Sequence, residues 1–326
     1  MQLRPLGSSD LRVSEISLGC WTMGGLNWVD GHANGWANVD EDEIAAAIRH
    51  AVDAGVNHFD NADVYGNGRA ERMLARVFRR LGLRSEDFVV ASKVGHFKGT
   101  APHAYAPLHL RHQCEQSLQN LERDYLDIYY FHHGNFGESD MWLDDAVAVM
   151  DDLVAAGKVR LKGQSAYSSS DFARVVPKVR PTVLQSWAHA LDTKFIRPET
   201  IVGQLLESRE MSFVAFSPLA QGRVLDKYDP ANPPQFSPGD NRAGNPGFKA
   251  EALAELQPKL AQLKGRFGET TEDLAAVALR YVLRHPRVAC VIPGFRNERQ
   301  VTCNLAGAGR SLSDDDLAFI TAVMQG

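Results

Sequence analysis

Four side chains in the first half of the sequence have the chemistry needed to protonate a carbonyl oxygen during its reduction. They are Asp60, Tyr65, Lys93 and His132. Reduction of an aldehyde or ketone needs a hydride donor and an acid, and a protein side chain supplies only the acid. We assign the acid to Tyr65, because an ammonium such as that of Lys93 lowers the phenol pKa from its ordinary value of about 10. Asp60 would keep Lys93 charged, and His132 would hydrogen-bond the substrate oxygen.

Short apolar segments with the composition of β-strands precede these residues. The segments 56–59, 88–92 and 126–131 lead to Asp60, Lys93 and His132 respectively. In a parallel α/β barrel the carboxyl ends of different strands meet at one mouth, where such folds carry their active sites. We therefore expect the four side chains to lie together despite their separation in sequence.

Eight such segments alternate with helical segments along the chain, which is the number that a closed barrel requires. The candidate strands are residues 16–20, 56–59, 88–92, 126–131, 159–165, 182–185, 212–216 and 288–293. Helical periodicity with capping signals fills the gaps, for example from Asp40 to Gly55, and further helices are expected to begin after Thr270 and Ser313. The predicted fold is α/β, a (β/α)8 TIM barrel that forms a single domain over residues 1–326.

Two segments fall outside this alternation. Residues 1–14 contain Gly7-Ser8-Ser9-Asp10 between apolar residues, which predicts an N-terminal hairpin that closes the barrel floor. The connection after the seventh strand, residues 218–270, is unusually long, and its first half is rich in proline and glycine. A long connection on the catalytic side is usually a lid or a ligand clasp, and a merely tolerated insertion is the alternative.

The composition is that of an ordinary globular protein, with 44% apolar residues, 23% charged residues and a formal net charge of −5 over 326 residues. Acidic and basic residues are interspersed, so neither nucleic acid nor an anionic membrane is an expected partner. No apolar run approaches the length that spans a bilayer, and the N-terminus lacks a signal-peptide pattern, which predicts a cytoplasmic protein. The four cysteines have neither close pairing nor zinc-ligand spacing, so we expect free thiols and no metal site.

Each of the four candidate residues also has a purely structural interpretation. Asp60 could cap a helix and Tyr65 could pack within a loop. Lys93 could be a charge at the barrel rim, and His132 a polar residue of the core. Their joint occurrence near the ends of strands favours the chemical interpretation.

The sequence around these residues resembles that of the aldo-keto reductase family over nearly the whole chain. The resemblance rests on the segments HFDNADVYG (58–66), SKVG (92–95), SL (117–118), DIYYFH (127–132), GKVR (157–160), FSPL (216–219) and IPGFR (292–296). It implies a catalytic tetrad formed by Asp60, Tyr65, Lys93 and His132, with Tyr65 as the proton donor. It also implies a small-molecule carbonyl substrate and a nicotinamide cofactor that lies extended across the barrel mouth.

The same resemblance implies a set of cofactor-binding residues, namely Ser165, Gln185, Phe216, Ser217, Leu219, Gly294, Arg296, Gln300 and Asn304. Ser165 and Gln185 match positions that hydrogen-bond the carboxamide, although a structural amide is an equal alternative for Gln185. Phe216 matches an aromatic residue that stacks on the nicotinamide, where tyrosine is more common, and Ala166 stands where many members have asparagine. Gln300 and Asn304 match positions near the adenine.

The type of cofactor depends on the segment that follows the eighth strand. Phosphate sites in many barrels lie in the loops after the last strands, beside the N-terminus of a helix. The guanidinium groups of Arg296 and Arg299 could bind a 2′-phosphate, which favours NADP(H) over NAD(H). Solvated surface arginines are the alternative.

Aromatic residues after the first expected strand suggest an apolar substrate pocket. The candidates for substrate contact are Trp21, Trp28, Trp36 and His133. Core packing explains each of them equally well. His133 would face away from the site if the strand before it continues.

Two other functions fit parts of the sequence. Potassium-channel β-subunits, which are relatives of the family, use the reductase barrel as a regulatory module, and an intact tetrad is compatible with such a module. A barrel lyase would use Lys93 as a Schiff-base nucleophile, but Asp60 would keep Lys93 protonated. A classical dinucleotide-binding fold is disfavoured, because Gly66-Asn67-Gly68 lacks the third glycine of that motif.

Overall fold

Eight parallel strands form a barrel in the computed structural model, which describes residues 1–29 and 31–326. In order around the barrel they are β3 (Leu18–Gly19), β6 (His58–Asp60), β7 (Val89–Val94), β8 (Leu126–Phe131), β9 (Val159–Ser165), β10 (Val183–Trp187), β11 (Ser212–Phe216) and β12 (Val288–Ile292). The barrel closes between its first and last strands, where the Ser17 amide donates to the Val291 carbonyl at 2.9 Å. All eight predicted strands are present, which confirms the predicted (β/α)8 barrel.

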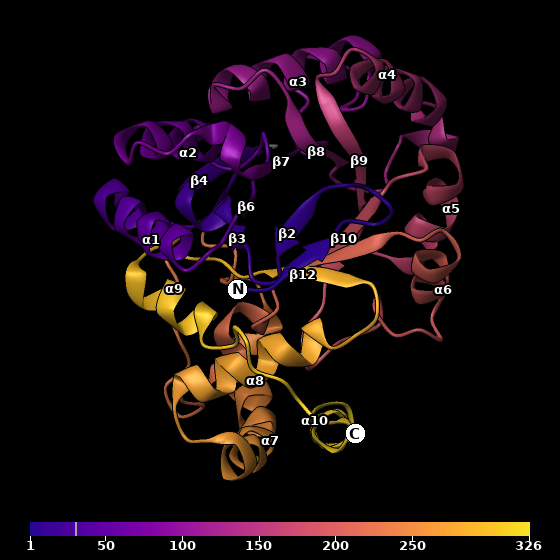
Figure 1. Ribbon diagram of the computed structural model, residues 1–326. Helices are drawn as coiled ribbons and strands as arrows, with labels where there is room; N and C mark the ends of the chain where they lie inside the picture. The colour runs from indigo at the N-terminus through magenta and orange to yellow at the C-terminus, as the bar shows by residue number, and fades with distance from the viewer. Residues whose placement is uncertain (30) are drawn as a thin grey trace.

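Helices follow the strands and surround the barrel, with α7 and α10 outside the ring, beside α8 (Figure 1). They are α1 (Glu41–Asp53), α2 (Arg69–Arg80), α3 (Pro107–Leu121), α4 (Leu143–Ala155), α5 (Ser169–Val179), α6 (Ile201–Ser208), α7 (Ala250–Phe267), α8 (Thr271–Leu283), α9 (Glu298–Leu305) and α10 (Asp314–Gln325). Short 3₁₀ segments are η1 (Cys20–Met23), η2 (Ser85–Asp87) and η3 (Glu138–Asp140). The helix N-termini that the capping signals predicted are present. Asp40 caps α1, while Thr270 and Ser313 form capping boxes at α8 and α10.

The N-terminal hairpin covers the amino-terminal end of the barrel, as predicted (Figure 1). Its strands β1 (Leu3–Pro5) and β2 (Arg12–Ser14) are antiparallel. Leu6 and Val13 are fully buried and pack against barrel residues that include Ile128. Because these apolar side chains fill the floor, a ligand would enter the barrel from its carboxyl end.

A second hairpin, which was not predicted, stands near the carboxyl end of the barrel. Its strands β4 (Leu26–Val29) and β5 (His32–Gly35) are antiparallel. The long connection after β11 passes through η4 (Ala220–Leu225) and η5 (Pro246–Phe248) before α7 begins. The amide of Asn241 in this connection donates to the Gly35 carbonyl at 2.9 Å. The connection and the hairpin are therefore joined, and both contribute to the wall of a cavity.

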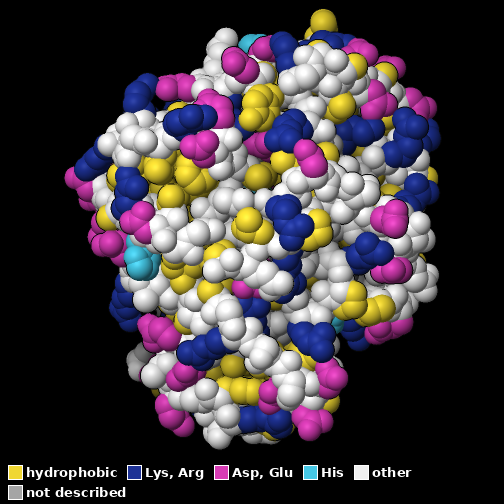
Figure 2. Space-filling model, in the orientation of Figure 1, with side chains coloured by type: hydrophobic (Ala, Val, Ile, Leu, Met, Phe, Trp, Pro, Cys, Tyr) yellow, Lys and Arg dark blue, Asp and Glu magenta, His cyan; other side chains and the backbone are white. Residues whose placement is uncertain are grey.

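The surface carries acidic and basic side chains next to one another. Figure 2 shows this mixture on the face that is turned to the viewer in Figure 1. Exposed ion pairs such as that between Arg287 and Glu207, at 2.7 Å, contribute to it. Within the described ranges, no helix is both long and apolar enough to cross a membrane.

Candidate active site

A cavity of about 750 Å³ opens at the carboxyl end of the barrel. Asp60 at the end of β6, Tyr65 in the following loop and His132 directly after β8 all belong to its wall. Lys93 lies behind this wall in β7 and is fully buried. The structure thus brings together four residues that are separated by up to 72 positions in the sequence, because parallel strands place their carboxyl ends at one mouth.

The Lys93 ammonium is the centre of this group. It donates to Oδ1 of Asp60, to the backbone carbonyl of Asn61 at 2.7 Å and to the phenol oxygen of Tyr65 at 3.2 Å. An ammonium has three protons to donate, so these three acceptors use all of them. Because the phenol oxygen accepts from Lys93, the proton of Tyr65 remains available to a group in the cavity.

The pKa of Tyr65 differs from the expectation. From the sequence we expected Lys93 to lower the phenol pKa. Burial instead raises this pKa well above its ordinary value, and the charge of Asp60 raises it further. Asp60 is held directly against Lys93, so its negative charge offsets the field of the ammonium at the phenol. Tyr65 is therefore protonated at neutral pH, and Lys93 can stabilise negative charge on its oxygen only as the proton leaves.

His132 presents a neutral imidazole beside Tyr65. Burial lowers the pKa of His132 well below its ordinary value, and the neighbouring His96 and Lys93 lower it further. The ring centroids of His132 and Tyr65 are 5.9 Å apart. A neutral ring that borders the cavity can donate one hydrogen bond without bringing a charge into the site.

The residues expected to hold a cofactor lie mostly along the same cavity. Eight of the nine belong to its wall: Gln185, Phe216, Ser217, Leu219, Gly294, Arg296, Gln300 and Asn304. Gln185 also donates to Oδ2 of Asp60 at 2.7 Å. Ser165 lies outside the wall, and its hydroxyl is buried without a hydrogen-bond partner in the described part of the chain.

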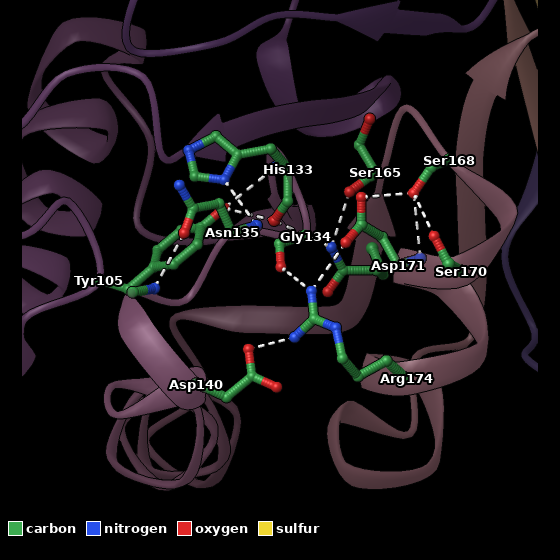
Figure 3. Close-up of polar contacts among 12 residues, drawn as sticks. Tyr105, His133, Gly134, Asn135, Asp140, Ser165, Ser168, Ser170, Asp171 and Arg174 are labelled. Carbon is green, nitrogen blue, oxygen red and sulfur yellow. Dashed lines mark hydrogen bonds and ion pairs between the residues drawn. The ribbon is translucent and has the colours of Figure 1, made fainter.

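The four candidates for substrate contact divide into two pairs. Trp21 and Trp36 belong to the cavity wall, and Trp21 stacks on Tyr65 with ring centroids 5.8 Å apart. Trp28 lies on β4 with 63% of its surface exposed, away from the wall. His133 lies in a polar network with Tyr105 and Asn135 (Figure 3), and its Nε2 bonds the Gly95 carbonyl at 2.8 Å.

The model of the Aldo/keto reductase family matches residues 15–325. This chain belongs to the aldo/keto reductase family. It is therefore an oxidoreductase of a family that uses nicotinamide cofactors and acts on small molecules. The resemblance noted from its sequence motifs is confirmed.

Several relatives span nearly the whole length of this aldo/keto reductase. The chain is 25% identical to the L-galactose dehydrogenase of Arabidopsis thaliana, over 100% of this chain and 95% of the relative. It is 29% identical to a probable voltage-gated potassium channel subunit beta of Oryza sativa subsp. japonica, over 94% of this chain and 90% of the relative. The fold is shared with the glycerol dehydrogenase of Gluconobacter oxydans, with a TM-score of 0.80 at 22% identity, over 98% of this chain and 94% of that one.

Four cationic side chains lie along the cavity of this aldo/keto reductase, and two of them were expected from the sequence. Arg296 and Arg299 were expected near a phosphate, and Lys227 and Arg242 from the connection after β11 join them in the wall. Burial lowers the pKa of Lys227, and the charges of Arg242, Arg296 and Arg299 lower it further. Arg242 is paired with Asp240 at 2.8 Å, whereas Lys227 has no such carboxylate among the described groups that shift its pKa and lies in the field of the three arginines. Such a group of cations suits a bound anion, and the phosphates of a nicotinamide dinucleotide are anionic.

The backbone that carries Lys227 close to the wall is strained. Ser217, Ala220 and Gln221 have positive φ angles of 51°, 48° and 58°. Gly222 has a φ of 87°, in the left-handed region that favours glycine. Such backbone strain is typical of ligand-binding segments.

Several residues of the wall were missed by sequence reasoning. They include Asn27, His96, Tyr167, Gln221, Lys227 and Arg242. His96 and Tyr167 follow the expected third and fifth strands, so their positions just past strand ends were the available signal. Lys227 and Arg242 lie in a connection without periodicity, where the sequence contains no indication of which cations face inward.

Proposed function

We propose that this aldo/keto reductase catalyses the reversible, NADPH-dependent reduction of aldehydes and ketones to alcohols. The observation that carries the proposal is the arrangement around Lys93, whose three protons are all donated and leave the Tyr65 proton free. Tyr65 gives this proton to the carbonyl oxygen, and Lys93 stabilises the charge that appears on the phenol oxygen. His132 orients the carbonyl by donating to the same oxygen. The bound nicotinamide supplies the hydride.

The cavity wall supports a specific arrangement for the cofactor. Phe216 offers an aromatic face for the nicotinamide, with Ser165 near the carboxamide. Ser165 does not belong to the cavity wall, but its buried hydroxyl has no partner within the described residues and so remains able to bond a carboxamide. Gln300 and Asn304 would contact the adenine end of the cofactor. Ser217, Leu219 and Gly294 supply wall contacts between these two ends.

The preference for NADPH is supported by Arg296 and the cations around it. A 2′-phosphate would offset the positive charge that Arg296 and Arg299 place on Lys227. Dissociation constants for NADPH and NADH test this directly, and we expect NADPH to bind at least ~10-fold more tightly, in line with one charge-assisted contact. Replacement of Arg296 by alanine should weaken NADPH binding more than NADH binding. Tighter binding of NADH by the native protein would reverse the assignment.

The reaction itself is tested by loss of NADPH absorbance with a panel of aldehydes and ketones. We expect turnover with members of the panel and none with carboxylic acids. The same panel in the presence of borohydride tests the lyase alternative, since a covalent adduct at Lys93 would indicate Schiff-base chemistry. The pairing of Lys93 with Asp60 argues against that outcome.

A regulatory module is the second candidate function. It is favoured by the 29% identity to a probable potassium channel subunit beta over 94% of this chain. A regulatory module would keep NADPH bound through gel filtration. None of the carbonyl compounds in the panel would then cause oxidation of the bound NADPH. Turnover of any panel member at a rate that depends on Tyr65 would instead support the enzyme.

A further inference from the structure

Five aromatic rings contact one another in succession along the cavity wall. They are Trp21, Tyr65, His132, His96 and Tyr167. Their successive ring centroids are separated by 5.8, 5.9, 4.5 and 6.1 Å. Tyr65 and His132, the residues that bind the carbonyl oxygen in the proposed function, stand in the middle. A carbonyl held there has an indole on one side and the pair formed by His96 and Tyr167 on the other.

The pair formed by His96 and Tyr167 is polar and uncharged. The Nε2 atom of His96 lies 2.9 Å from the Tyr167 hydroxyl, which makes a hydrogen bond. Burial lowers the pKa of His96 to about 4, and the neighbouring His133 and Lys93 contribute to this shift. At neutral pH the ring is therefore neutral, with one nitrogen that donates and one that accepts. Tyr167 belongs to the cavity wall and is 42% exposed, so a ligand in the cavity can contact it.

The chemistry of this pair matches a hydroxyl group better than an anion. A hydroxyl donates and accepts, as the phenol and the imidazole do. The cations of the cavity form their own group, in which Lys227 feels Arg242, Arg296 and Arg299. The charges that act on His96 come instead from His133 and from Lys93, which is already committed to Asp60. Within the described residues, neither of these leaves a free cation for a carboxylate or phosphate beside His96.

We propose that His96 and Tyr167 form a hydroxyl-binding subsite that selects α-hydroxy aldehydes and α-hydroxy ketones. This inference rests on the proposed reductase function. The rings of His96 and His132 are 4.5 Å apart, so the group that His96 binds is close to the carbonyl, as a hydroxyl on the adjacent carbon would be. The two side chains bond each other when no hydroxyl is present, so a plain carbonyl leaves neither of them unpaired. The expected preference in kcat/KM is therefore about tenfold, which corresponds to one or two neutral hydrogen bonds. A preference of about 10⁴-fold would require buried polar groups that lose their partners when the plain carbonyl binds.

Isosteric substrate pairs provide the test. We would measure kcat/KM with NADPH for hydroxyacetone against butanone and for glycolaldehyde against propanal. The native protein should prefer the hydroxylated member of each pair by about tenfold. Tyr167→Phe removes one hydroxyl, and His96→Phe removes the imidazole but keeps a ring against His132. Each variant should reduce the preference, to within roughly twofold for His96→Phe, whatever happens to the absolute rates.

The control is Tyr125→Phe, a matched change just before β8 begins, at the opposite end of that strand from His132. It should leave the tenfold ratio unchanged. Equal kcat/KM values for the two members of each pair in the native protein would overturn the subsite while leaving the reductase function intact. A tenfold preference that both subsite variants retain would do the same. If no carbonyl were turned over, the reductase function would fail. Tryptophan fluorescence, to which Trp21 in the cavity wall contributes, would then compare binding of hydroxyacetone and butanone to the NADPH-loaded protein, and equal affinities would remove the subsite as well.

Discussion

The side-chain amide of Gln185 donates to Oδ2 of Asp60 at 2.7 Å, across a barrel in which the two residues lie 125 positions apart. Lys93 donates to the other carboxylate oxygen, Oδ1. Both oxygens of Asp60 are therefore held from different strands, which fixes the carboxylate and, through it, the ammonium that faces Tyr65. Of the two interpretations that the sequence allowed for Gln185, this contact supports the structural amide.

Replacement of Gln185 by leucine should destabilise the protein and disturb the ion pair. The variant leaves Oδ2 of Asp60 buried without its donor, and loss of a hydrogen bond to a charged group costs about 1.5–3 kcal/mol. Urea denaturation measures the change in the free energy of unfolding. Gln204→Leu on the exposed face of α6 is the matched control, and it should change this free energy by less than about 0.5 kcal/mol. Equal effects of the two changes would show that the contact has no energetic weight.

Replacement of Tyr65 by phenylalanine should remove turnover and spare cofactor binding. The change deletes only the transferable proton, so kcat for carbonyl reduction should fall by roughly 10²–10⁴-fold. The dissociation constant for NADPH, measured by fluorescence quenching, should stay within about twofold. A variant that kept near-native turnover would exclude Tyr65 as the acid.

Lys93→Met should impair both stability and turnover. Addition of Asp60→Asn to this variant should restore stability but not turnover. Removal of one partner of a buried ion pair leaves Asp60 uncompensated, which costs about 3–5 kcal/mol. The double variant Asp60→Asn/Lys93→Met carries no buried charge at this place and should recover much of that loss, yet remain inactive. Thermal denaturation and steady-state kinetics give the two readouts.

An exposed ion pair provides the comparison for Lys93. The ammonium of Lys178 bonds Asp144 at 2.6 Å, with 52% and 77% of the two side chains exposed. Lys178→Met should therefore cost less than about 1 kcal/mol. A similar loss from both lysine variants would contradict the importance assigned to burial of the Lys93 pair.

The rate of reduction should be nearly independent of pH around neutrality. His132 has a pKa well below its ordinary value because it is buried, and Tyr65 has a pKa well above its own for the same reason. Neither group changes its protonation state between about pH 6 and 9, so kcat/KM at saturating NADPH should be flat there. A break near pH 6.5 that disappeared in His132→Gln would show instead that His132 titrates during turnover.

Glu71 should make the protein less stable as the pH rises. It is fully buried, it accepts from Ser92 at 2.6 Å and from Asn120 at 2.8 Å, and burial raises its pKa above the usual value of 4.5. The folded state then holds a proton that the unfolded state has already lost, so the stability from the neutral form is complete below pH 4.5 and declines as the pH rises through the folded-state pKa.

Glu71→Gln tests this sign. Glutamine keeps the shape and cannot ionise, so the stability of the variant relative to the native protein should increase between pH 5 and pH 8. Urea denaturation at the two pH values measures the difference. A difference that stayed constant, or one that moved in favour of the native protein at pH 8, would mean that Glu71 is ionised in the folded state.

The order of elements in this protein follows from local patterns that act within about 15 residues. Apolar runs such as 126–131 and 159–165 were placed correctly to the residue. The capping boxes at Thr270 and Ser313 were readable because their members are three positions apart. The second hairpin, formed by β4 and β5, was missed.

The sequence by itself determined the barrel and the four residues that meet at its mouth, because strand ends are set by local apolar periodicity and parallel strands must converge. Only the tertiary structure decided the environment of each side chain. The raised pKa of Tyr65, the hold of Gln185 on Asp60 and the contact between His96 and Tyr167 depend on burial and on distances between segments far apart in the chain. These quantities arise from packing, which no local pattern encodes.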